Sequence, residues 1–250
     1  MLNMLWAERQ KIRRLPMIWI TVFATVMAAV IVFALGREIY YGPEAVYYGS
    51  RYIDHAGWYM NVAQSLATFF LLPSVAALFG SYLICREEQE DTLKALRLIP
   101  INEAKLTAAK MTITCVLCIF LYLLLFVITL SAELILHASG LSAAMILGFL
   151  KEYVLDGLGV FLAIAPIIAF VSRWKKGYWL ALIGTQIYAF AGLLAGMSST
   201  LTTFYPITAV FNLSGHHIVS EERIGGSMAV LLLCGCLAAF ILKRVKYKKP

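Results

Sequence analysis

The chain has 250 residues, of which 61% are hydrophobic and 14% are charged, and its mean hydropathy is +0.81. A soluble domain is roughly half apolar and about a quarter charged, so this composition excludes a water-soluble globular fold and predicts helices that face lipid. The net charge of +7 indicates attraction to anionic lipid in the bilayer and a side-specific excess of basic residues, and it does not indicate nucleic-acid binding.

Residues 1–15 predict a short helix that lies in the membrane interface. Four apolar side chains can form one face of this helix: Leu2, Leu5, Trp6 and Ile12. Four basic side chains can face water and headgroups: Arg9, Lys11, Arg13 and Arg14. A simple positively charged flank before the first span is the alternative interpretation.

Stretches of about 20 apolar residues without charge predict six transmembrane helices. They cover approximately residues 17–36, 60–85, 108–132, 153–172, 177–197 and 224–243. An even number of spans places both ends of the chain on one side of the membrane. That side then holds 17 of the 21 Lys and Arg residues, so both termini are predicted to be cytoplasmic. The expected fold is an all-α, single transmembrane domain over residues 1–250.

Polar residues recur on the second and fifth predicted spans. Asn61, Gln64 and Thr68 follow helical spacing in the second, and Gln186 lies near Tyr188 in the fifth. Such groups are costly towards lipid, so they face either other helices or a wet cavity. The sequence leaves both interpretations open.

Prolines and charges modify this picture of the spans. Pro73 and Pro166 each remove a backbone donor and predict kinks in the second and fourth spans. No charged residue is expected deep in a span, since Glu133 and Asp156 fall near the outer ends of the third and fourth. A proton- or ion-coupled carrier usually needs a buried ionisable group, so the energy for any transport is expected to come from another source.

Two outer segments are also distinctive. Residues 37–59 are rich in tyrosine, which is typical of a belt at the membrane boundary. Residues 198–223 are too polar for a seventh span and predict short helices that dip into the outer leaflet. His216 and His217 are adjacent, which puts their rings on different faces of a helix, and no metal site is predicted.

The inner loop between the second and third spans predicts a short amphipathic helix. Its acidic start complements the helix dipole, its leucines form an apolar stripe, and a proline ends it. Such a stripe is suited to a groove on another protein, whereas anionic headgroups would repel the acidic end of a helix lying flat on the membrane. The expected contact residues are Glu87, Glu88, Glu90, Asp91, Thr92, Leu93, Leu96, Arg97 and Pro100.

This loop and the six spans resemble the permease subunits of type-2 ABC exporters. In that family an acidic stretch, a Gly-Thr pair, a leucine-rich helix and a proline follow the second span; here Asp91 replaces the glycine and Thr92 keeps the threonine. The resemblance implies that the loop is the coupling helix, which docks on a nucleotide-binding subunit. It also implies that the second and fifth spans line the contact with a second permease, identical or related. Asn61, Gln64, Thr68, Gln186 and Tyr188 are therefore the candidate pathway residues.

The sequence contains no phosphate loop of the form Gly-Xaa4-Gly-Lys-Ser/Thr, so the chain is not expected to bind or hydrolyse ATP. ATP and Mg are expected on a partner ATPase, with no cofactor in this chain. The resemblance is greatest to bacitracin-resistance and lantibiotic-immunity permeases, which implies an amphiphilic cargo and a place in the bacterial cytoplasmic membrane. A secondary transporter and a non-transporting scaffold are the alternatives. The motifs of an intramembrane hydrolase are missing.

Overall fold

The structure, a computed structural model, describes residues 6, 8, 10, 16–89, 103–171, 177–198 and 200–244. Helices dominate this part of the chain, and its only β-type pairing is an isolated bridge between Tyr40 and Arg51. The predicted interfacial helix lies almost entirely outside the described residues, and so do residues 90–100 of the predicted coupling segment.

Five helices in the described residues are long and apolar enough to cross a membrane. They are α2 (Pro16–Glu38), α6 (Glu103–His137), α7 (Ala143–Val171), α8 (Tyr178–Ala195) and α11 (Glu221–Arg244). A sixth candidate combines α3 (Trp58–Phe70) and α4 (Leu72–Gln89), which are bent by 48° at a short break. The prediction of an all-helical membrane fold is confirmed, with five or six candidate spans.

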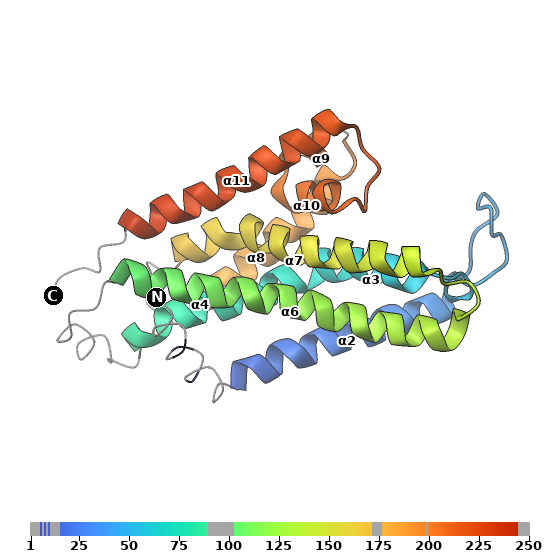
Figure 1. The fold of residues 1–250 in the computed structure, drawn as a ribbon, viewed down its shortest axis with the longest axis horizontal. Helices are drawn as coiled ribbons and strands as arrows, with labels where there is room; N and C mark the ends of the chain where they lie inside the picture. The colour runs from blue at the N-terminus through green and yellow to red at the C-terminus, as the bar shows by residue number, and fades with distance from the viewer. Residues whose placement is uncertain are drawn as a thin grey trace.

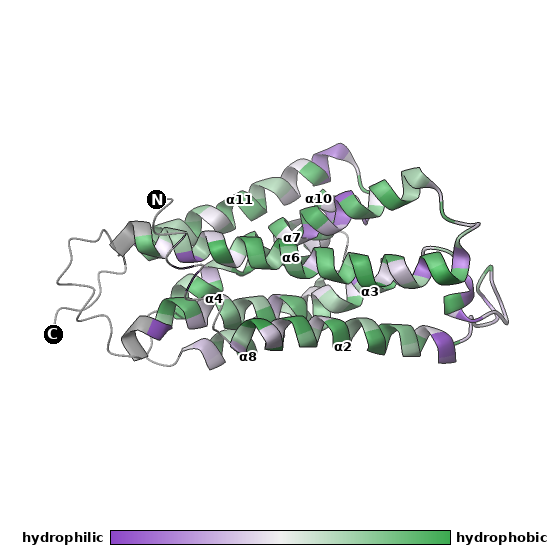
Figure 2. Cartoon of the chain, turned by 60° about the horizontal axis from the view of Figure 1, so that its bottom comes forward, coloured by the Kyte–Doolittle hydropathy of each residue, from purple (hydrophilic) through white to green (hydrophobic). Residues whose placement is uncertain are grey.

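The candidate spans form an elongated bundle and run back and forth along its long axis (Figure 1). The beginning of α2 and the end of α11 lie at the same end of the bundle, together with the end of α4 and the beginning of α6. The tyrosine-rich connection after α2 and the turn between α6 and α7 lie at the opposite end. Hydrophobic residues cover the middle of the helices, and hydrophilic residues gather near the ends (Figure 2).

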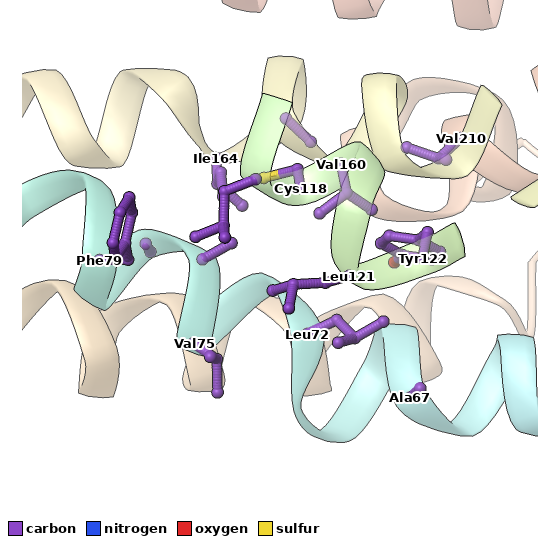
Figure 3. Close-up of a cluster of buried hydrophobic side chains, with 14 of the residues drawn as sticks. Ala67, Leu72, Val75, Phe79, Cys118, Leu121, Tyr122, Val160, Ile164 and Val210 are labelled. Atoms are coloured by element: carbon purple, nitrogen blue, oxygen red, sulfur yellow. The ribbon is translucent and has the colours of Figure 1, made fainter. Parts of the chain in front are cut away.

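The core lies where the bent pair α3 and α4 packs against α6 and α7 (Figure 3). Leu72 and Phe79 face Leu121 of α6 and Ile164 of α7, and all four side chains are buried. Gly157 allows α6 and α7 to approach closely, because a Cβ at this position would lie 2.8 Å from the Cα of Ile119. This close contact holds the two longest helices together.

The two prolines have different effects on their helices. The kink predicted from Pro73 is confirmed, because α3 and α4 meet at Leu71, two residues before the proline. By contrast, α7 continues as one helix through Pro166.

The prediction that no charged residue lies deep in a span is wrong for Asp156. Helix α7 begins at Ala143, ten residues before the predicted start, so Asp156 lies near its middle and is fully buried. The charges of Lys151 and Glu152 interrupt the apolar stretch and concealed this first part of the helix. Helix α6 is also longer than predicted, and Glu133 within it is 1% exposed.

Candidate functional site

Two buried polar side chains of α3 connect it to α7 and α6. Gln64 donates from Nε2 to Oδ2 of Asp156 in α7 over 2.6 Å. The hydroxyl of Thr68 is hydrogen-bonded to that of Tyr122 in α6 over 2.7 Å. Because these groups are buried and leaving such a group unpaired costs about 1–3 kcal/mol, the bonds fix α3 against α6 and α7.

The beginning of α3 is held by a carboxylate from the far end of α6. Glu133 accepts a hydrogen bond from the backbone N–H of Tyr59 over 2.9 Å, and His137 lies 3.0 Å from its other oxygen. A negative charge at a helix N-terminus is favourable, so Glu133 has a structural role there. The hydroxyl of Tyr59 donates to the carbonyl of Ala29 in α2 over 2.8 Å, which adds α2 to this corner.

A short hairpin of α9 (Leu201–Phe204) and α10 (Pro206–Ser214) closes the same half of the bundle. His216 follows it, with Nε2 at 2.8 Å from the hydroxyl of Ser65 in α3 and Nδ1 at 3.6 Å from Glu152 in α7. Burial lowers the pKa of the neighbouring His217, and the His216 ring adds to this effect. These contacts anchor the hairpin to α3 and α7.

Gln186 of α8 forms two hydrogen bonds to residues at the break between α3 and α4. In a continuous helix the carbonyl of Phe69 would accept from the N–H of residue 73, but Pro73 has none. Gln186 donates from Nε2 to this carbonyl over 3.4 Å and accepts from the hydroxyl of Ser74 over 2.8 Å. A side chain of α8 thus replaces part of the backbone hydrogen bonding that the proline removes.

The candidate pathway residues therefore occupy different environments. Gln64 and Thr68 are buried inside the chain, Asn61 is exposed, and Gln186 and Tyr188 are half-buried. Of the two open interpretations, helix–helix contact describes Gln64, Thr68 and Gln186 in this conformation. Of the candidate coupling residues, Glu87 and Glu88 belong to the last turns of α4, and the other seven, at positions 90–100, lie outside the described residues.

The sequence did not predict the central position of Asp156 or its pairing with Gln64. The available signal was the carboxylate itself, within an apolar helix of 29 residues. In the part of the chain that the structure describes, no three His, Cys, Asp or Glu residues are grouped so that they could hold a metal ion. The polar network combines hydrogen bonds between side chains, such as those of Gln64 with Asp156 and Thr68 with Tyr122, with hydrogen bonds from side chains to the backbone.

Comparison with known proteins identifies the class of this bundle. A family model described as "ABC-2 family transporter protein" matches residues 4–192, which is most of the chain. The chain belongs to the ABC-2 transporter family. As an ABC-2 permease it is a multi-pass membrane protein without ATPase activity of its own, and permeases of this family work with ATPase subunits.

A curated relative is the bacitracin transport permease of Bacillus licheniformis. The present chain is 31% identical to that bacitracin permease over 131 residues. The match covers 52% of this chain and 62% of the relative, so the chain spans less than two thirds of that protein's length.

Proposed function

We propose that this permease exports an amphiphilic substrate, with peptide antibiotics as the first class to test, using ATP hydrolysis by a separate ATPase subunit. The observation that carries the proposal is the similarity to the bacitracin transport permease. A lipid or a drug is a second kind of amphiphile that the same pathway would accept.

The proposed orientation places both termini in the cytoplasm, on the side with 17 of the 21 basic residues. Residues 1–15 then lie in the inner interface, and residues 87–100 form a cytoplasmic coupling helix that contacts the ATPase. The hairpin of α9 and α10 lies on the outer side as a re-entrant segment. The hydrogen bonding of its backbone supports this assignment, because backbone inside a membrane must be satisfied by the protein. The Asn212 amide donates to the carbonyl of Thr202 over 3.1 Å, and the Ser227 hydroxyl of α11 donates to the carbonyl of Thr203 over 3.4 Å.

A pathway between two permeases is proposed along α3 and α8. Asn61 is exposed on α3, and Gln186 and Tyr188 are half-buried on α8. Exposed aromatic rings lie near them, with Phe70 of α3 and Phe190 of α8 in edge-to-face contact at 5.1 Å. Gln64 and Thr68 support this surface from behind through their bonds to α7 and α6.

The buried carboxylate of Asp156 favours a second candidate, a proton-coupled carrier, because ionisable groups inside transmembrane bundles often relay protons. Both candidates predict protection against an amphiphilic antibiotic, and they differ in the source of energy. One experiment separates them.

The test measures bacitracin susceptibility of cells that produce the permease with its ATPase subunit. We expect protection with the active ATPase and none with an ATPase whose phosphate-loop lysine is replaced. The control is the inactive pair at equal abundance in the membrane. Protection that persists with the inactive ATPase would contradict the ABC mechanism, and no protection against bacitracin with the active ATPase would contradict the choice of the peptide class.

A further inference from the structure

A groove of about 460 Å³ lies between α6, α7 and α11. Its volume falls within the range of about 300–1,000 Å³ typical of small-molecule sites. The walls are almost entirely apolar and include Met111 of α6, Phe161 of α7 and Leu242 of α11. The groove is separate from the polar network of α3.

Small residues on α11 explain why the groove is not filled by the protein. Gly235, Ala238 and Ala239 follow helical spacing and line the same side of the groove. Helix α11 packs mainly on α7 and α10 and has few contacts with α6. A gap therefore remains where larger side chains would have closed the contact between α6 and α11.

The charge at one end of the groove is positive. Lys243 lines the groove and is exposed at the last turn of α11, and none of the described lining residues is acidic. Arg244, Lys246, Lys248 and Lys249 follow in the sequence. In the proposed orientation this end lies at the inner leaflet, where anionic lipids attract basic side chains.

We propose that the groove binds one anionic phospholipid of the inner leaflet, with an acyl chain along α11 and its phosphate at Lys243. Basic pockets between transmembrane helices on the cytoplasmic side commonly bind such headgroups. The proposal rests on the orientation given above and does not depend on the cargo. The apolar walls of the groove contact the acyl chain of the lipid, and Lys243 favours a negatively charged headgroup.

The experiment is native mass spectrometry of the purified full chain in mild detergent. The probes are phosphatidylglycerol and phosphatidylcholine with identical acyl chains, added at increasing concentration. We expect one phosphatidylglycerol per permease to be retained preferentially, with an advantage of about fivefold over phosphatidylcholine from one lysine near the surface.

Two variants test the two halves of the site, each with a matched control. Lys243→Gln should remove the fivefold preference, while Lys151→Gln, an exposed lysine at the opposite end of α7, should keep it. Ala239→Phe should fill the groove and abolish retention of both lipids. Ala229→Phe, at another exposed position of α11, should leave retention unchanged. Equal melting temperatures of the paired variants exclude unfolding as the cause.

Several results would overturn the proposal. Equal retention of the two lipids, or an unchanged preference in Lys243→Gln, would show that the charge of Lys243 does not select an anionic headgroup. Retention in Ala239→Phe would place the lipid elsewhere. Displacement of the lipid by bacitracin would make the groove a cargo site, and conversion of a dimer to monomers by Ala239→Phe would make it a permease contact. Because lipid retention is measured without ATPase or transport, its failure is distinguishable from failure of the export function.

Discussion

Gln186, Ser74 and Pro73 form a local unit at the bend between α3 and α4. The bend leaves the Phe69 carbonyl without its usual donor, and Gln186 supplies one from another helix. A proline in a candidate span is tolerated here because a side chain of a neighbouring helix supplies the hydrogen bond that the proline cannot donate. Gln186 therefore contributes to stability whether or not it also contacts cargo.

Replacing Gln186 by Leu should lower the free energy of unfolding by about 1–3 kcal/mol, because it removes the donor to the part-buried Phe69 carbonyl and the acceptor of the buried Ser74 hydroxyl. In a Pro73→Ala background the loss should be smaller, since residue 73 then provides the N–H that Phe69 needs. Thermal unfolding of the wild type, the two single variants and the double variant in detergent measures this coupling. An equal loss in both backgrounds would contradict the proposed role of Gln186.

Gln64 and Asp156 form the second residue-scale unit, buried between α3 and α7. Gln64→Leu should lower the free energy of unfolding by about 1–3 kcal/mol, because it removes a hydrogen-bond donor from the buried Asp156 carboxyl group. The double variant Gln64→Leu with Asp156→Leu should be more stable than Gln64→Leu alone, because replacing both partners also removes the buried group that has lost its donor. Unfolding of single and double variants tests this, and additive losses would contradict it.

At the scale of elements, charge-free stretches located the helices well where the flanking charges coincide with the helix ends. Helix α2 was predicted over 17–36 and spans Pro16–Glu38. The start of α7 does not coincide with a flanking charge, because Lys151 and Glu152 lie on faces that tolerate polar groups and the helix continues past them. Helical spacing indicated that Gln64 and Thr68 share a face, but their partners are 92 and 54 residues away. Only the packing of the bundle determines such pairs.

The coupling segment is the element whose function the sequence predicts most specifically. Leu93→Asp with Leu96→Asp should release the ATPase subunit, because the changes remove the apolar stripe that would fill its groove. Co-purification of ATPase with tagged permease is the measurement. The control is Ile218→Asp, a fully exposed position in the connection between α10 and α11, which should retain the ATPase. Normal recovery of ATPase with the double variant would exclude this segment as the contact.

At the scale of the whole molecule, five or six candidate spans in one chain would provide half of a transport pathway, so we expect two permeases and two ATPase subunits to act together. Within one permease, the close contact at Gly157 and the hydrogen bonds of α3 with α6 and α7 hold the helices together as one bundle. Such a bundle is suited to rocking as a unit against a second permease. We therefore expect the energy input to come from the ATPase and the cargo surface to lie in the permease pair.

The most direct measurement is transport of fluorescently labelled bacitracin into inverted proteoliposomes that contain the permease and its ATPase. We predict accumulation that requires Mg-ATP, stops with a non-hydrolysable ATP analogue and continues when a proton ionophore is present. Accumulation driven by a proton gradient without ATP, or no ATP-dependent movement of the peptide, would contradict the account.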